Sequence, residues 1–215
     1  ESVEELNAAF ADKIIALLQA GINANGRASL VVSGGRTPLA LFKQLSQAEL
    51  NWQLIDITLA DERWVDQADD ASNEKMVRNN LLVGNAANAN FIGLKNTADN
   101  AEQGVTTCTE NLKSIQTPFD VLILGMGEDG HTASLFPCSS QLQAGLDLDS
   151  GNDYIAVQPT TAPNQRMSLT LPALLNSKNI FLHLTGEAKK AVLDVATSSD
   201  DASEMPIRAV LKHAD

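Results

Sequence analysis

The alternation of short apolar segments with segments of helical periodicity constrains the fold of this chain more than any other feature of its sequence. Apolar residues between Val3 and Leu18 recur on one helical face, which predicts a first helix over about residues 2–20, ended by Gly21 and the Asn/Gly stretch to Gly26. Seven further apolar segments are predicted as strands: Ala28–Val32, Leu54–Ala60, Phe91–Leu94, Phe119–Leu124, Tyr154–Val157, Arg166–Leu171 and Ile180–Leu184.

Helical segments separate these strands. Thr37 as N-cap and Pro38 at the first helical position predict a helix that ends near Ser46. Further helices are predicted from Ser72 through Leu81, from Ala101 to Leu112 and after Gly186. Strands that alternate with helices predict an α/β fold, a Rossmann-like open and mostly parallel sheet with helices on both faces.

The length of 215 residues fits one domain better than two, and no linker divides the sequence, so we predict a single domain over 1–215. The loosest stretch, Gln141–Asp153, is predicted to be a surface excursion. Because the sequence lacks an initiator Met, we expect that the native N-terminus has been trimmed.

Charge and composition exclude several classes of function. The net charge of 15 − 27 = −12 argues against a nucleic-acid surface, which needs a basic stripe, but a locally positive pocket for a small anion remains open. No run reaches the roughly 18 apolar residues of a membrane span, and the acidic, amphipathic start argues against a signal peptide. Cys108 and Cys138 lack metal-ligand spacing and are interpreted as reduced thiols of a cytoplasmic protein.

A glycine-rich turn, Ser33-Gly34-Gly35-Arg36-Thr37-Pro38, follows the first predicted strand. Such a turn before a helix directs backbone N–H groups at one spot, and its hydroxyl side chains add donors, so we predict an anion site here. No Gly-Lys-Ser/Thr follows, which excludes a nucleoside-triphosphate loop. An ordinary tight turn with a capped helix remains the alternative.

Charged residues also follow other predicted strands. Asp61-Glu62-Arg63 comes directly after a strand, where ligands of open α/β sheets bind, although a solvated loop would have the same composition. Three later cations, Arg166, Lys189 and Arg208, are candidates for holding an anion, and each alone would also fit a surface charge.

The segment Gly125–Pro137 carries the strongest chemical signal. Asp129 and His131 lie two residues apart in a glycine-rich turn, whose backbone N–H groups from Gly127 to Gly130 we expect to serve as oxyanion donors. Histidine suits general-base chemistry near neutral pH. Of the other two histidines, His183 is predicted to be a satisfied core residue and His213 to be exposed. The turn also matches G-x-G-x-x-G, but Pro137 interrupts the helix that a dinucleotide site requires.

Together these segments resemble the 6-phosphogluconolactonase family, within a larger group that includes glucosamine-6-phosphate deaminases. The matching stretches are Ser33–Pro38, Asp61–Arg63 with Ser72-Asn73, Gly125–Pro137, Arg166–Thr170 and Thr185–Lys189. The resemblance implies a Rossmann-like fold, no metal, no organic cofactor, and hydrolysis of a phosphorylated sugar lactone in the oxidative pentose phosphate pathway. The family has a strand before the first helix and sequence after the last, so we expect both ends to be shortened here.

The resemblance also implies roles for residues. His131 corresponds to the family's proposed base, and Asp129 would orient it. Arg63 would hold the substrate or its developing charge, and Asp61 belongs to the same segment. The sugar-phosphate site would comprise Ser33, Gly34, Gly35, Arg36, Thr37, Arg166, Lys189 and Arg208.

Three alternatives remain. The deaminases have asparagine-glutamate-proline where this chain has Leu135-Phe136-Pro137, and they tend to have tyrosine in place of Arg63, so both positions favour the lactonase. A non-catalytic sugar-phosphate sensor is disfavoured by the complete Asp129/His131 loop. A nicotinamide dehydrogenase would rest on the glycine fingerprint alone. The oligomeric state cannot be derived from the sequence.

Overall fold

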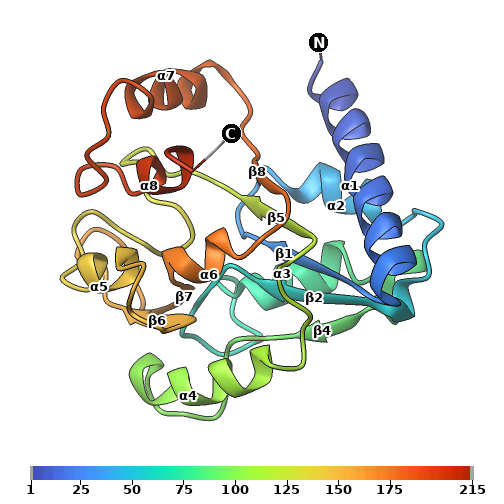
Figure 1. Ribbon diagram of the computed structural model, residues 1–215, viewed down its shortest axis with the longest axis horizontal. Coiled ribbons are helices and arrows are strands. Elements are labelled where there is room, and N and C mark those ends of the chain that lie inside the picture. The colour runs from blue at the N-terminus through green and yellow to red at the C-terminus, as the bar shows by residue number, and fades with distance from the viewer. Residues whose placement is uncertain (1, 214–215) are drawn as a thin grey trace.

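Two β-sheets organise the chain in the computed structural model, which describes residues 2–213 (Figure 1). The larger sheet is parallel, in the order β4-β2-β1-β5-β8, and the smaller is antiparallel, in the order β3-β7-β6. The strands of the larger sheet are β1 Ala28–Val32, β2 Ile55–Leu59, β4 Asn90–Ile92, β5 Val121–Leu124 and β8 Ile180–Leu182. Those of the smaller are β3 Asp61–Arg63, β6 Tyr154–Val157 and β7 Arg166–Leu169.

The predicted α/β fold with a mostly parallel sheet is therefore confirmed. Every residue of β1, β2 and β5 is buried, as expected for parallel strands covered on both faces. The sequence did not separate the small antiparallel sheet from the large one, and Asp61–Arg63, expected as the end of a strand, forms strand β3 of its own.

The helices cover these sheets. They are α1 Val3–Asn25, α2 Leu39–Leu45, α3 Asn73–Asn80, α4 Ala101–Leu112, α5 Leu142–Leu146, α6 Leu171–Leu175, α7 Glu187–Ala196 and α8 Ile207–Leu211, with short 3-10 turns at Trp52–Leu54 and Gly84–Asn88. Helix α1 packs against α2 and β1, whereas α4 packs against the small sheet. No helix among residues 2–213 is long and apolar enough to cross a membrane.

Two predicted helix boundaries were wrong. Gly21 does not end α1, because it lies inside the helix where a Cβ atom would come within 2.8 Å of the Asp120 carboxyl; the helix ends at Gly26, with φ of 77°. Thr37 does not cap α2, whose N-cap is Pro38 without a side-chain hydrogen bond. Within the predicted surface excursion 141–153, α5 buries Leu142 in the core.

The order of the parallel strands determines where a ligand can enter. From β1 the chain continues to β2 and β4 on one side, whereas β5 and β8 lie on the other. The loops after β1 and β5 therefore run in opposite directions, which opens a crevice at the carboxyl ends of these two strands. The glycine turn after Val32 and the loop after Leu124 both begin at this crevice.

Candidate active site

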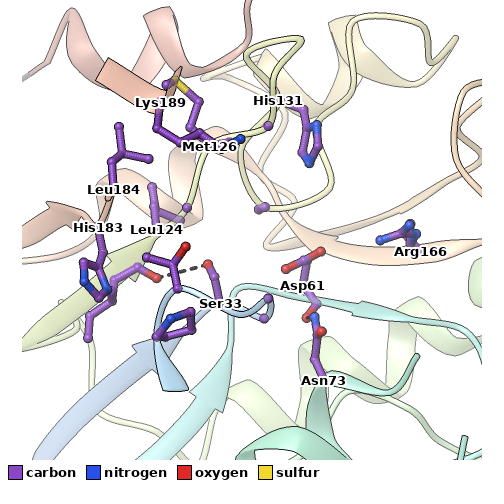
Figure 2. A pocket seen from close by; sticks show the side chains of 18 of the residues that line it. Ser33, Asp61, Asn73, Leu124, Met126, His131, Arg166, His183, Leu184 and Lys189 are labelled. Carbon is purple, nitrogen blue, oxygen red and sulfur yellow. Dashed lines mark hydrogen bonds between the residues drawn. The ribbon is translucent and has the colours of Figure 1, made fainter. Parts of the chain in front are cut away.

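A pocket of about 250 Å³ lies at the carboxyl ends of β1 and β5 (Figure 2). The glycine turn after β1 and the loop after β5 both line this pocket. Residues of the small sheet and of the segment after β8 with α7 complete its lining. The predicted site residues that line it are Ser33, Gly34, Gly35, Thr37, Asp61, Arg63, His131, Arg166 and Lys189. Five segments distant in sequence thus supply one cavity.

The glycine turn is held close to its neighbours. A Cβ atom on Gly34 would lie 2.0 Å from the Asn73 side-chain oxygen, so glycine is needed for α3 to approach. Ser33 donates its hydroxyl to the Ile123 carbonyl at 3.0 Å, which ties the loop to β5. Within residues 2–213, the backbone N–H groups from Gly34 to Thr37 donate to no other group, so they remain available to an anion. Arg36 is exposed and does not line the pocket, so its predicted binding role has no support in the geometry.

His131 and Asp129 form a directly bonded pair. The distance from His131 Nδ1 to Asp129 Oδ1 is 2.5 Å, and the same oxygen accepts the His131 backbone N–H at 3.1 Å. Figure 2 shows the His131 ring directed into the pocket, opposite Ser33 and Asp61. Asp129 does not line the cavity and contacts it only through His131. When Asp129 accepts the Nδ1 proton, Nε2 is the nitrogen with a free lone pair, as a general base requires.

The loop's own N–H groups are less available than predicted. Gly127 donates to the His131 carbonyl at 2.9 Å and Gly130 donates to the Gly127 carbonyl at 3.2 Å. These bonds close the turn around the histidine. Gly127 and Gly130 are therefore not free to serve as oxyanion donors, whereas the N–H groups of Glu128 and Asp129 donate to no group among residues 2–213.

Gly127 also leaves room for the His131–Asp129 pair. Its Cβ position would lie 2.1 Å from His131 Nδ1 and 2.6 Å from Asp129 Oδ1, while its backbone conformation is open to other residues. We expect Gly127→Ala to displace the imidazole and to lower kcat on the order of 10²-fold, as misplacement of about 1 Å can do. Steady-state kinetics with a thermal melt would check this. A fully active Gly127→Ala enzyme would mean that the His131–Asp129 geometry does not limit the rate.

Because side chains alternate along strand β3, Asp61 and Arg63 lie on one face of the strand and Glu62 on the other. Asp61 and Arg63 line the pocket, whereas Glu62 points the other way and is fully buried. The Glu62 carboxylate accepts three backbone N–H groups, including those of Asn73 and Glu74 at 2.8 and 2.7 Å, which fixes β3 to the start of α3. Burial raises the pKa of Glu62, and these hydrogen bonds oppose the shift. Glu62 thus holds β3 and the start of α3 together without facing the pocket.

The Asp61 carboxylate faces the cavity but is already bonded. Ser134 donates its hydroxyl to Asp61 Oδ2 at 2.5 Å, and both side chains are buried. Asn73 in turn donates to the Asp61 backbone carbonyl at 2.9 Å. Asp61 is therefore held in place beside the two arginines of the small sheet.

Arg63 and Arg166 are direct partners in the β3–β7 pairing. Each has one hydrogen bond to a backbone carbonyl, from Arg63 to Ala71 at 2.7 Å and from Arg166 to Pro163 at 3.3 Å. The Nε atom of each is buried and has no partner in the described part of the chain. Burial, followed by the neighbouring Arg63 charge, lowers the pKa of Arg166. Two adjacent guanidinium groups with unused donors are suited to binding an anionic group of a ligand in the pocket.

The other two predicted cations differ. Lys189 of α7 lines the pocket and donates to the Met126 carbonyl at 2.9 Å, at the end opposite Arg166. Arg208 is buried away from the pocket and donates to the carbonyls of Ala196, Val195 and Asp201. The predicted phosphate role of Arg208 is therefore wrong, because this guanidinium closes the C-terminal end of α7.

Sequence reasoning missed part of the lining. His183 was expected to be a satisfied core residue; it is buried, but neither ring nitrogen finds a partner among residues 2–213, and the residue lines the pocket. Burial lowers the pKa of His183. Asn73 also lines the cavity; the family resemblance included Ser72-Asn73, but no role was predicted for Asn73. His213 is exposed, as predicted.

The loop after β5 does not have the form of a dinucleotide site. No helix starts at Gly130; the next helix, α5, begins only at Leu142. A pyrophosphate would thus lack the helix N-terminus that the fingerprint normally provides.

Comparison with known proteins is consistent with this geometry. A family model described as glucosamine-6-phosphate isomerases/6-phosphogluconolactonase matches residues 1–215. The chain belongs to this family. A family member from Rhizobium meliloti named 6-phosphogluconolactonase is 42% identical over 214 residues, covering 100% of this chain and 92% of that protein. Another of that name, from Pseudomonas putida, is 41% identical and covers 96% and 85%.

A solved structure of a protein with the same name as these relatives is also similar to this chain. The crystal structure of a 6-phosphogluconolactonase from Shewanella baltica superposes with a TM-score of 0.98 at 49% identity, covering 100% of this chain and 91% of that one. The predicted membership of the glucosamine-6-phosphate isomerase/6-phosphogluconolactonase family is thus confirmed, together with its fold.

Proposed function

We propose that this chain is a cytoplasmic enzyme that hydrolyses 6-phospho-D-glucono-1,5-lactone to 6-phosphogluconate, in the oxidative pentose phosphate pathway. The observation that carries the proposal is the 2.5 Å His131–Asp129 pair at a pocket that also contains Arg63, Arg166 and Lys189. A base beside a cationic pocket suits a hydrolysable lactone ring that bears an anionic phosphate.

The phosphate is the anchoring group in this proposal. The free N–H groups of the glycine turn bind its oxygens, with the Arg166 guanidinium reaching toward it from one end of the pocket and the Lys189 ammonium from the other. Backbone donors and a planar guanidinium suit a phosphate because they make several charge-assisted hydrogen bonds at once. Anchoring at this end holds the lactone carbonyl carbon, C1, near His131, and binding energy is thereby used to orient the reaction.

The chemical step uses one water molecule. His131 Nε2 takes a proton from the water as its oxygen bonds to C1, which gives a tetrahedral oxyanion. The intermediate collapses as the bond from C1 to the ring oxygen breaks. The protonated His131 then gives its proton to that oxygen, which becomes a hydroxyl group. Asp129 holds the imidazole throughout, and its charge stabilises the imidazolium formed between the two transfers.

Arg63 stabilises the oxyanion in this proposal. Gly127 and Gly130 already donate their N–H groups within the turn, whereas Arg63 lines the pocket and its Nη2 makes no hydrogen bond within residues 2–213. One well-placed oxyanion donor is worth about 10²–10³-fold in rate.

Parallel assays with two substrates test this function. We expect the chain to accelerate hydrolysis of freshly generated 6-phosphogluconolactone and to release no ammonia from glucosamine 6-phosphate, because Phe136 stands where the deaminases have a proton-exchanging glutamate. Ammonia release without lactone hydrolysis would make the chain a deaminase. Binding of both compounds without turnover would make it a sensor.

A further inference from the structure

Phe136 contacts both His131 and Arg166. The rings of Phe136 and His131 are stacked, with centroids 4.2 Å apart and planes inclined by 27°. The Arg166 guanidinium carbon lies 5.5 Å from the centre of the same Phe136 ring. Phe136 itself is buried, with 3% of its surface exposed. One aromatic ring therefore joins the proposed base to the proposed phosphate ligand.

The Phe136 ring is more deeply buried than the His131 ring, and backbone hydrogen bonds fix the chain on both sides of Phe136. Leu135 donates to the Thr132 carbonyl at 3.0 Å, Ser139 donates to the Phe136 carbonyl at 3.1 Å, and Pro137 follows. The His131 side chain is 30% exposed, and its hydrogen bond is made through Nδ1. A single hydrogen bond at one ring nitrogen leaves the ring plane free to tilt. The stacked face of Phe136 supplies the second constraint.

We propose that Phe136 is a positioning residue whose ring fixes the plane of the His131 imidazole and the place of the Arg166 guanidinium, so that both groups act on one substrate molecule. The inference rests on the proposed function. Phe136 needs no contact with the lactone. It acts through His131, which is stacked on its ring, and through Arg166, whose guanidinium lies near the same ring.

An aromatic ring suits this task better than an aliphatic side chain. Its flat face matches the imidazole, and stacked aromatic pairs gain stabilisation beyond the burial of their area. The same ring attracts a guanidinium through its quadrupole. Leucine would fill part of the space but would give neither interaction.

The test compares Phe136→Leu with the ring-retaining Phe136→Tyr. We expect Phe136→Leu to lower kcat on the order of 10²-fold, because the base is misplaced, and to raise KM because Arg166 loses its support. Phe136→Tyr should restore both constants. The matched control is Phe91→Leu, since Phe91 also has an arginine, Arg78, at 4.9 Å but lies in β4, away from the pocket. That variant should leave both constants unchanged.

A spectroscopic readout does not depend on turnover. The chain has only three histidines, so the ring protons of His131 can be assigned by NMR from the signals lost in His131→Gln. Stacking on Phe136 should shift them upfield of those of the exposed His213. We expect the shift to vanish in Phe136→Leu, to persist in Phe136→Tyr, and to remain unchanged in Phe91→Leu.

The outcomes separate the inference from the proposed function. Wild-type kcat and KM in folded Phe136→Leu would overturn the positioning role while leaving the lactonase intact. Unshifted His131 protons in the unaltered chain would also overturn it, and this holds even if Phe136→Leu does not fold. Failure of the lactonase assay with the ring-dependent shift present would refute the function and leave the stacking in place.

Discussion

Replacing His131 by glutamine is expected to lower kcat for 6-phosphogluconolactone by about 10²–10⁴-fold, the usual contribution of general acid–base catalysis. Glutamine retains a polar side chain but cannot take a proton from water. Because His131 is partly exposed and lies in a turn closed by backbone hydrogen bonds, the melting temperature should change little. Initial rates corrected for spontaneous hydrolysis, together with a thermal melt, would check this.

His213→Gln provides the matched control, since His213 is exposed and outside the pocket. It should retain full activity. Asp129→Asn should cause a smaller loss than His131→Gln, because it weakens the orientation of the base without removing it. Equal rates for His131→Gln and the unaltered chain would exclude His131 as the base.

Replacing Arg166 by alanine is expected to lower kcat/KM much more for the phosphorylated lactone than for glucono-1,5-lactone. Removing one partner of a buried, hydrogen-bonded charge pair costs about 2–5 kcal/mol, or roughly 30-fold and more. Arg166 is 7% exposed and lines the pocket, and its Nη1 makes no hydrogen bond within residues 2–213, so we expect this donor to be available for the phosphate. Kinetics on both lactones would measure the difference.

Arg208→Ala separates binding from stability. Arg208 is equally buried, but its guanidinium bonds the end of α7 and not the pocket. We expect a lower melting temperature with an unchanged ratio of kcat/KM between the two lactones. Equal losses on both lactones for Arg166→Ala would remove Arg166 from the phosphate site.

Much of the fold and site was predictable because the determining signals are local. Short, mostly apolar runs such as 28–32 and 121–124, bounded by turn residues, favour strands buried on both faces, and they form the central pair β1 and β5. Ligands of such sheets bind at the carboxyl ends of the strands, so the residues that follow these runs were the natural candidates. The glycine turn and His131 were found in this way.

The failures concern long-range contacts. No local pattern shows that 61–63 pairs with 166–169 in a separate sheet, although that pairing brings Arg63 next to Arg166. The chain after α7 folds back so that the Arg208 guanidinium bonds backbone carbonyls at the end of α7 and does not reach the pocket. The stacking of Phe136 on His131 depends on a turn whose geometry the sequence does not reveal. The pairing of Asp129 with His131 was predictable because the two residues are only two positions apart in the sequence.

The most direct test of the proposed reaction is the disappearance of freshly generated 6-phosphogluconolactone with and without the unaltered chain, under conditions where spontaneous hydrolysis is measured in the same run. We predict a rate above the spontaneous one that rises in proportion to the protein concentration and returns to near the spontaneous rate in His131→Gln. A rate equal to the spontaneous one at every protein concentration would contradict the proposed function.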